Sequence, residues 1–420
     1  MRLLVLSQHY WPENFRINEV VESLWDAGCE VSVLTGQPNY PDGKVLPGYK
    51  PWRLGPQQHG RTTIYRVPLV PRGDAGATRL VANYLSFLLA ACVLGPWVLR
   101  GRRFDAIFVY GTSPILQAIA GIVLKHAKRA KLAVWVQDLW PQSLEATGFV
   151  RSQRLLGAVA AVVRWIYRRS DLLLVQSQAF VASVQAMAGK TPVEYHPNPG
   201  EMAFDDVGPI DHPPALSLPP GFNVVFAGNL GTVQALDTII EAATLLRERP
   251  HIRFVLVGSG SRGDWVRDEI ARRALTNVVL AGRFPPAAMP GIFAQSSALL
   301  LTLARSDNLA QTVPSKLQAY LAAGRPVIAC LDGEGARVVE LAQAGIACSA
   351  EDPIGLCAAV TALHCTAPER LEAMGRAGQR YYREHYDPGL LARRLRSRLA
   401  ALTGVGATRE AAPQPRRDRT

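Results

Sequence analysis

A lysine at the start of a helical pattern is the side chain in this sequence best placed to bind an anion. Lys316 ends the segment Thr312-Val313-Pro314-Ser315-Lys316, and a helical pattern then runs through Leu317–Gly324. Thr312 can cap this helix, and proline is tolerated in its first turn. The lysine, the Ser315 hydroxyl and the free N–H groups of the first turn would then converge on a diphosphate. The alternative is an ordinary capped helix with a solvated lysine.

Two glycine-rich turns in the same half of the chain follow apolar runs. Gly228-Asn229-Leu230-Gly231 ends one predicted strand, and its glycines allow backbone N–H groups to approach an anion. Gly258–Gly263 has the spacing G-x-G-x-x-G, which on its own suggests a dinucleotide site. It follows the second strand of its domain, however, and the next strand ends in Ala281-Gly282-Arg283, without the acidic residue that would hold a ribose. We therefore interpret it as a tight strand-to-helix turn near a nucleotide.

Two polar residues in the first half directly follow predicted strands. Asp138 lies just after Leu132–Val136, and His9 closes the first strand, Leu3–Leu6. Because the carboxyl ends of parallel strands face the ligand crevice of an open α/β sheet, both residues are candidate catalytic groups. Asp138 could position or deprotonate a hydroxyl group, or it could simply cap the following helix. His9 could equally be a structural histidine.

Short apolar runs alternate with longer helical patterns along the chain, which indicates βα units and parallel sheets. The predicted strands are Leu3–Leu6, Val31–Leu34, Thr63–Arg66, Ala106–Val109, Leu132–Val136 and Leu172–Val175 in the first half, and Asn223–Ala227, Arg253–Val257, Val278–Leu280, Leu299–Leu301 and Pro326–Ala329 in the second. Dense prolines between 196 and 220 suit an interdomain linker. We expect an α/β fold with two Rossmann-like domains, residues 1–200 and 221–402, facing a central cleft, with a linker at 201–220 and a disordered tail at 403–420.

Composition favours anionic partners and a reducing compartment. The 420 residues carry a formal net charge of +12, and 48% of them are hydrophobic, enough for two buried cores. A generic arginine-rich composition without any such partner is the alternative. The six cysteines form no C-x-x-C pair and the eight histidines form no ligand-spaced cluster, so we expect free thiols and no metal site. The short first apolar run predicts a buried strand and not a signal peptide.

Leu80–Leu99 is a run of twenty residues without a charge, a length that could span a bilayer. Asn83 and Gly95-Pro96 interrupt it, and it lies between two strands of the first sheet, so a spanning helix is not expected. We predict a helix that is partly core and partly bound to the membrane surface, with arginines nearby to meet anionic lipids. A second basic and apolar stretch, at 151–169, reads similarly. The alternative is two buried crossover helices with solvated arginines.

Together these motifs resemble the retaining GT-B glycosyltransferases of family four, and among them the bacterial surface-polysaccharide (O-antigen and capsule) enzymes related to L-fucosamine transferases. The segments that carry the resemblance are Gln8–Arg16, Leu34–Pro41, Asp138–Glu145, Phe226–Gly231, Val313–Tyr320 and Gly333–Ala336. The resemblance extends over about residues 1–395. Each motif is weak alone, and the set is specific.

The resemblance implies a metal-independent transferase with a nucleotide-sugar donor, preferably a UDP-sugar, in the second domain and an acceptor in the first. Helix ends and basic side chains would stabilise the departing diphosphate in place of a metal. The residues carried over to the donor site are Gly228, Asn229, Gly231, Ser315 and Lys316 around the diphosphate, Arg283 near the base and Glu334 near the sugar. The two glutamates that the wider family places around this helix read Gln311 and Ala319 here. This removes the carboxylate that would recognise the ribose from that helix.

The expected function is sugar transfer, with retention, to a lipid-linked oligosaccharide acceptor in cell-surface polysaccharide biosynthesis. We expect a cytoplasmic protein bound peripherally to the inner face of a bacterial plasma membrane, with an anionic membrane surface as a partner and no cofactor. A sugar-nucleotide 2-epimerase of the same fold would instead need acid and base groups on both sides of the sugar and no lipid. A non-catalytic nucleotide-binding paralogue would explain Gln311 and Ala319. Nucleic-acid binding fits the charge, but no recognition module is visible.

Overall fold

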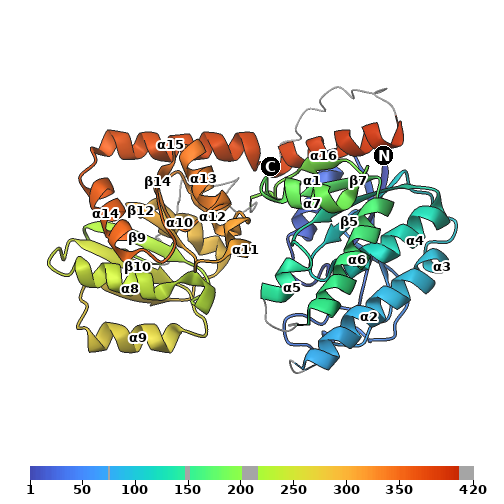
Figure 1. Cartoon of the computed structure of the whole chain (residues 1–420), viewed down its shortest axis with the longest axis horizontal. Coiled ribbons are helices and arrows are strands. Elements are labelled where there is room, and N and C mark those ends of the chain that lie inside the picture. Colours follow the sequence, from blue (N-terminus) through green and yellow to red (C-terminus); the bar gives the residue numbers. More distant parts are fainter. Residues whose placement is uncertain (74–75, 147–151, 201–215, 406–420) are drawn as a thin grey trace, which may run out of the picture.

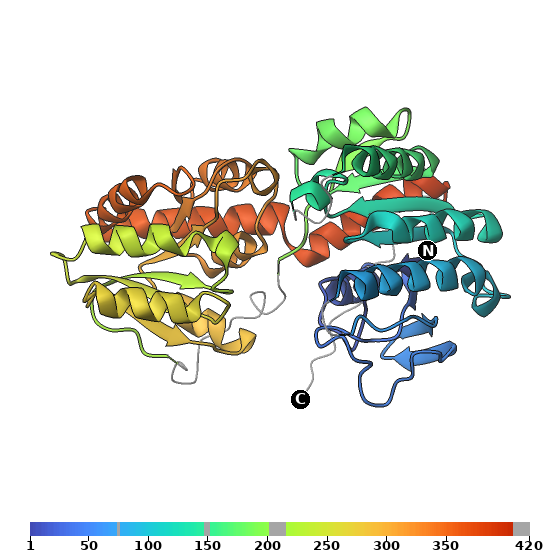
Figure 2. The ribbon, with the colours of Figure 1, turned by 60° about the horizontal axis from the view of Figure 1, so that its bottom comes forward.

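The computed structural model describes residues 1–73, 76–146, 152–200 and 216–405. They form two α/β lobes, each built around one β-sheet, with eight strands in the first and six in the second (Figure 1). Figure 2 shows the lobes side by side, each with its sheet between helices. The expected fold class, two Rossmann-like domains, is therefore confirmed. Most of the expected linker, at 201–215, and of the expected tail, at 406–420, lies outside the described residues.

The first sheet has the strand order β3-β4-β2-β1-β5-β6-β7-β8. Its strands are β1 (Arg2–Leu6), β2 (Glu30–Thr35), β3 (Gly55–His59), β4 (Thr62–Arg66), β5 (Ala106–Gly111), β6 (Lys131–Val136), β7 (Leu172–Val175) and β8 (Val193–Tyr195). All neighbours are parallel except β3 and β4. The six strands predicted here are present. The edge strands β3 and β8 were not predicted, because a polar and a three-residue strand carry little apolar pattern.

The second sheet is wholly parallel, with the order β11-β10-β9-β12-β13-β14. Its strands are β9 (Phe222–Ala227), β10 (Ile252–Val257), β11 (Val278–Gly282), β12 (Ala298–Thr302), β13 (Val327–Cys330) and β14 (Gly345–Cys348). In order of appearance this is 3-2-1-4-5-6, the dinucleotide-fold order, which reverses between β9 and β12. The five predicted strands are present. The half-buried edge strand β14 was missed.

Alternate residues of each strand enter opposite cores, which explains the unbroken apolar runs. Leu4 and Leu6 pack on one face of the first sheet, and Leu3 and Val5 pack on the other. The helices of the first lobe are α1 (Ile17–Asp26), α2 (Ala77–Val93), α3 (Gly95–Val98), α4 (Ala118–Lys128), α5 (Gln142–Ala146), α6 (Gln153–Arg169) and α7 (Phe180–Ala188). Later helices are α8 (Leu236–Leu245), α9 (Gly263–Arg272), α10 (Met289–Ala294), α11 (Asp307–Ala310), α12 (Ser315–Ala323), α13 (Glu334–Leu341), α14 (Pro353–His364), α15 (Pro368–His385) and α16 (Pro388–Thr403).

The last helix, α16, returns to the first lobe. Its apolar residues Ala392, Leu395 and Leu399 share a core with β1 and α1, and Figure 1 shows α15 over the second lobe and α16 over the first. This corrects the expected second domain, 221–402, because α16 belongs to the first lobe by its packing. Spacings of three and four residues give α16 one apolar face, and the open face of the first sheet covers it.

The apolar segment Leu80–Leu99 forms two helices, α2 and α3, and not one. Gly95 opens α3, and its hydrogen atom faces Leu34 and Leu124 of the core. Asn83, in the middle of the segment, is fully buried and bound to other polar groups. In the described part of the chain, no helix combines the length and apolar character needed to cross a membrane.

Candidate active site

The carboxyl ends of the two sheets meet between the lobes. A pocket of about 490 Å³ is lined there by Tyr195, at the end of β8, and by Glu334 and Arg337 of α13. Ser177 Oγ, just after β7, donates a hydrogen bond to the carbonyl of Gln311 in the second lobe. Ligands of open α/β sheets bind beyond these ends, at the point where the strand order reverses. The site is therefore expected beyond β9 and β12 on one side and β1 and β5 on the other.

Lys316 and the glycine after β9 are brought together by a single tyrosine. Tyr320, one turn after Lys316 on α12, is buried, and its hydroxyl accepts a hydrogen bond of 2.9 Å from the N–H of Ala227. This bond holds the helix start against the end of β9. A Cβ atom at Gly228 would overlap the Lys316 side chain. Only glycine lets the lysine lie along the loop, so two residues that were assigned from the sequence to one diphosphate lie in contact.

The Lys316 ammonium group lies in an environment that favours an anionic ligand. Its Nζ lies 4.0 Å from the centroid of the Phe226 ring, a cation–π contact. Burial lowers the pKa of Lys316 to about 8. No hydrogen bond or ion pair of Lys316 occurs among the described residues, so the aromatic face is its sole charge-stabilising contact there. A bound diphosphate would supply the missing counter-charge.

The G-x-G-x-x-G turn supports the loop after β9 by packing and hydrogen bonds. A Cβ atom at Gly258 would overlap the carbonyl oxygen of Gly228, and Gly258 has φ +142°. Ser259 accepts a hydrogen bond of 2.9 Å from the N–H of Leu230, and Leu230 in turn accepts one of 2.9 Å from Arg262. The turn thus fits the interpretation as a tight strand-to-helix connection, and its glycines make room for the neighbouring loop.

Other predicted donor residues are more scattered. Asn229 is exposed in the loop after β9, and Ser315 is exposed at the start of α12. The N–H of Gly231 donates a hydrogen bond of 3.2 Å to Gln234 Oε1. Arg283 is exposed just after β11, two strands from β9. Glu334 is ion-paired with Arg337, with 2.5 Å between Oε1 and Nη2, in the pocket between the lobes.

The N-terminus of α12 differs from the expected cap. Thr312 Oγ1 donates a hydrogen bond to the carbonyl of Leu309, and Pro314 is the N-cap residue, without a side-chain cap. The N–H of Leu317 donates a hydrogen bond of 2.9 Å to the carbonyl of Pro314, whereas the N–H groups of Ser315 and Lys316 have no acceptor among the described residues and stay available to a ligand. Ala319 is buried on the same helix, and the Gln311 amide binds the carbonyl of Asp307.

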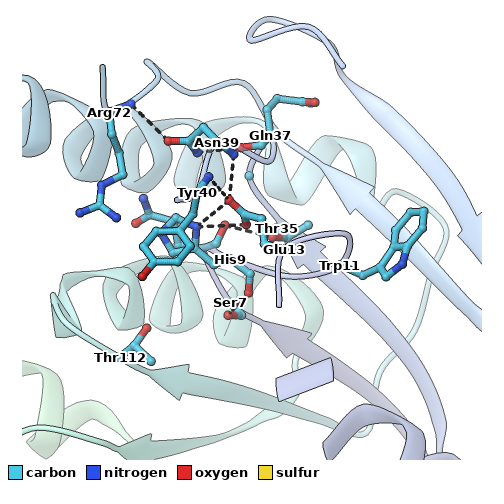
Figure 3. A network of polar contacts seen from close by, with 12 residues as sticks. Ser7, His9, Trp11, Glu13, Thr35, Gln37, Asn39, Tyr40, Arg72 and Thr112 are labelled. Carbon is cyan, nitrogen blue, oxygen red and sulfur yellow. Dashed lines mark hydrogen bonds and ion pairs between the residues drawn. The ribbon is translucent and has the colours of Figure 1, made fainter. Parts of the chain in front are cut away.

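On the first lobe, His9 lies at the end of β1 within a buried polar network (Figure 3). Its Nδ1 lies 3.1 Å from both carboxylate oxygens of Glu13. Glu13 Oε1 also accepts hydrogen bonds of 2.8 Å from the N–H groups of Asn39 and Tyr40. The His9 ring stacks on Phe15, with centroids 4.9 Å apart and planes inclined by 8°. Glu13 was not among the predicted site residues, although it is four residues from His9.

The network continues into α2 through buried amides. Asn83 donates a hydrogen bond of 2.6 Å to the carbonyl of Val70 and accepts one of 2.7 Å from Gln8 Nε2. Gln8 immediately precedes His9, and its own N–H donates to Gln117 Oε1 at 2.9 Å. Asn39 lies 3.4 Å from Asn83 in the same cluster. The polar residue that interrupts the apolar segment therefore anchors α2 beside His9.

Asp138 lies after β6 and binds a neighbouring loop. Its Oδ2 accepts a hydrogen bond of 2.7 Å from Ser113 Oγ, and Ser113 Oγ accepts one of 3.0 Å from Trp140 Nε1. The hydrogen bonds of the described residues include none from a backbone N–H of α5 to Asp138, so the alternative role as a helix cap is not observed. Within the same residues, no group of three or more His, Cys, Asp or Glu side chains could hold a metal ion.

Comparison with known families now identifies the chain. A model described as glycosyl transferase 4-like domain matches residues 14–199, and one described as glycosyl transferases group 1 matches residues 221–365. The chain is a group 1 glycosyltransferase. The two models divide the chain where its two sheets divide. They favour the transferase expectation over the epimerase and the non-catalytic alternatives.

Two relatives of this transferase are distant. It is 28% identical over 341 residues to the glycosyl transferase WcaI, assigned to colanic acid biosynthesis in Escherichia coli (strain K12), with 77% of this chain and 82% of WcaI covered. It is 24% identical over 272 residues to the glycosyltransferase WbjE of Pseudomonas aeruginosa, with 61% of this chain and 65% of WbjE covered.

Solved structures confirm the GT-B fold over nearly the whole transferase. Anabaena Alr3699/HepE in complex with UDP superposes with a TM-score of 0.66 at 13% identity, over 96% of this chain and 100% of that one. Sucrose-phosphate synthase from Thermosynechococcus elongatus superposes with a TM-score of 0.72 at 14% identity and the same coverage. At such identities the likeness shows the fold alone.

Proposed function

We propose that this transferase moves a sugar, with retention, from a UDP-sugar to a lipid-linked saccharide in surface-polysaccharide biosynthesis at the inner face of a bacterial plasma membrane. The donor would bind the second lobe and the acceptor the first. HepE in complex with UDP supports the choice of base, and WcaI supports the class of product. Retention follows the resemblance to family four.

The juxtaposition of Lys316 with Gly228 carries the proposal. A cation that lies along a glycine loop, at the N-terminus of α12, gives two complementary features for a diphosphate: a positive charge and the N–H groups of Ser315 and Lys316. Developing charge on a leaving diphosphate is stabilised by such groups without a metal. We assign Asn229, Gly231 and Ser315, which are neighbours of Gly228 and Lys316 in the chain, to the same diphosphate, and Arg283 and Glu334 to the base and the sugar.

Lys316→Ala tests the donor site in a thermal-shift experiment with UDP, GDP, ADP and CMP. We expect UDP to raise the melting temperature of the wild-type protein, because a ligand at 100 times its Kd stabilises the folded state by about 2.7 kcal/mol. The variant should lose this shift while remaining at least as stable without ligand, since it no longer buries a cation. Lys190→Ala, at an exposed lysine of the first lobe, is the matched control. A shift retained in Lys316→Ala would overturn the proposed donor site.

Two exposed apolar stripes support a membrane-bound acceptor. On α2 and α3, the side chains of Val81, Leu85, Leu89, Val93 and Trp97 recur every four residues and are between 43% and 70% exposed. On α6, Leu155, Val162 and Trp165 are likewise exposed. Both helices belong to the layer that α4 joins on one face of the first sheet (Figure 1).

Arginines frame these stripes on the same layer. Exposed arginines lie in the first turn of α2, after α3 and at the end of α6: Arg79, then Arg100, Arg102 and Arg103, and finally Arg168 and Arg169. An apolar surface with a cationic margin is the pattern of a protein that inserts shallowly among anionic lipids. The buried-crossover alternative accounts for the inward faces of these helices and leaves the outward stripes unexplained.

A further inference from the structure

The imidazole of His9 is held by contacts on one edge and one face. Glu13, which is 3% exposed, meets Nδ1, and Phe15 covers one face of the ring. Tyr40 lies obliquely beside the ring, with centroids 5.9 Å apart. Figure 3 shows His9, Glu13 and Tyr40 close together. A ring with this many neighbours has one orientation, so the chemical state of its free nitrogen is decided by what Nδ1 does.

The partners of Glu13 determine which nitrogen of His9 carries the proton. Two of the donors around the carboxylate are the backbone N–H groups of Asn39 and Tyr40, which can only donate. Glu13 therefore serves as an acceptor, and Nδ1 of His9 must donate to it. In the neutral imidazole, Nε2 is then an acceptor. No group of the described residues donates a hydrogen bond to Nε2.

We propose that Glu13 is a positioning residue that holds His9 in the Nδ1–H tautomer, so that Nε2 accepts a hydrogen bond from a hydroxyl of the acceptor sugar. The proposal rests on the proposed function for the identity of the ligand. His9 lies where the strand order of the first sheet reverses, between β1 and β5, which is the ligand position of such a sheet. A neutral imidazole nitrogen at this position can accept a hydrogen bond from a sugar hydroxyl.

Glu13→Gln offers a test that does not depend on activity. The glutamine oxygen can keep both backbone N–H groups, and its amide then presents N–H to Nδ1 of His9. Nδ1 must then accept a hydrogen bond instead of donating one, so the ring proton should move to Nε2. The ¹⁵N shifts of histidine-labelled full-length protein distinguish the two tautomers, and His9→Gln identifies the resonances among the eight histidines. Glu22→Gln, an exposed position on α1, is the matched control and should leave the tautomer unchanged.

The same spectra test the ligand. The UDP-loaded wild-type protein is titrated with octyl glycosides of glucose, galactose and N-acetylglucosamine. We expect at least one glycoside to shift Nε2 of His9, and Glu13→Gln to weaken the binding of that glycoside, because its hydroxyl must then turn and accept from Nε2–H instead of donating to Nε2. UDP binding, followed by the thermal shift, should stay unchanged in Glu13→Gln.

Each outcome decides a separate statement. An Nε2–H tautomer in the wild-type protein, or no change of tautomer in Glu13→Gln, overturns the positioning role. An Nε2 resonance that none of the glycosides moves overturns the contact with the acceptor and leaves His9 as a structural histidine. Absence of any UDP shift in the wild-type protein counts against the proposed function itself, whatever the tautomer of His9.

Discussion

Lys316 shows how a single side chain is prepared for a ligand that the free protein lacks. Its ammonium group is removed from water beside Phe226, and Gly228 leaves the space that a side chain would fill. The charge is costly in the free state, which is why burial lowers the pKa of Lys316 to about 8. An anion at the same place reverses that cost, because it favours the protonated form.

Donor binding should therefore weaken above pH 8. As the pH rises through the pKa of Lys316, the free protein loses the charge that attracts the diphosphate, so the Kd for UDP should rise about fivefold between pH 8 and pH 9. Titration calorimetry at these two values, in buffers of equal ionic strength, measures the change. In Lys316→Ala the Kd should be high and nearly independent of pH. An equal pH dependence in both proteins would assign the effect to another group.

At the scale of elements, a buried polar side chain fixes the position of α2 on the first sheet, and another fixes the position of α12 on the second. Tyr320 fastens α12 to the end of β9, and Asn83 fastens α2 beside Gln8. Because an unpaired buried amide or hydroxyl is costly, each helix has one favourable register. For α2 this register buries Phe87 and Ala91 and turns the opposite stripe outward.

The outward stripe should govern membrane binding. The double variant Leu85→Glu, Leu89→Glu places two charges in the middle of the apolar surface of α2, without touching its buried face. We expect it to bind vesicles of phosphatidylglycerol and phosphatidylcholine at least about tenfold more weakly than the wild-type protein in a flotation assay, since two apolar contacts and the attraction to anionic lipid are lost. Leu245→Glu, at an exposed leucine of α8, is the matched control. Equal flotation of the double variant and the wild-type protein would rule out this surface.

At the scale of the whole molecule, α16 ties the end of the chain to the first lobe. Arg398 pairs with Glu194, 2.7 Å away, and its guanidinium donates to the carbonyl of Tyr195 at 3.0 Å. The neighbouring His196 is fully buried, and burial together with Arg398 lowers its pKa to about 3, so it stays neutral and accepts from the guanidinium. These contacts hold β8, which leads into the connection between the lobes.

Leu395→Ala should destabilise the first lobe although it lies near the end of the chain. Leu395 is fully buried in the core that α16 shares with β1, and such truncations cost about 2–5 kcal/mol. Urea denaturation followed by tryptophan fluorescence reports mainly on this lobe, because seven of the eight tryptophans precede residue 200. Val405→Ala, at an exposed position beyond the helix, should be nearly neutral. A midpoint unchanged by Leu395→Ala would show that α16 adds little to the lobe.

Sequence alone predicted eleven of the fourteen strands of the two sheets, and it named the residues now proposed for the donor site. Runs such as Leu3–Leu6 and Leu172–Val175 are apolar at every position, as expected for strands that are buried on both faces of a parallel sheet. Their regular alternation with longer helical patterns indicates the βα topology. The assignment of Lys316 and Gly228 to one diphosphate followed from the resemblance and from local chemistry, whereas their direct contact came from the structure. The polar strand β3 and the short strand β8 were not predicted, because such edge strands form by hydrogen bonding to a neighbouring strand and have no distinctive apolar pattern.

Only the tertiary structure decided which distant residues meet. The sequence of α16 does not show that its apolar face packs on the first sheet, since any apolar surface of either lobe could cover that face. In the sequence, Tyr320 has the pattern of an ordinary core residue. Only the structure shows that its hydroxyl binds the N–H of Ala227 at the end of β9. Glu13 reads as an ordinary surface carboxylate until the turn at Asn39 and Tyr40 delivers two N–H groups to it. The periodicity of apolar residues predicts which face of a helix or strand is buried. The partner of a buried polar group depends on packing between segments far apart in the chain, which no local pattern predicts.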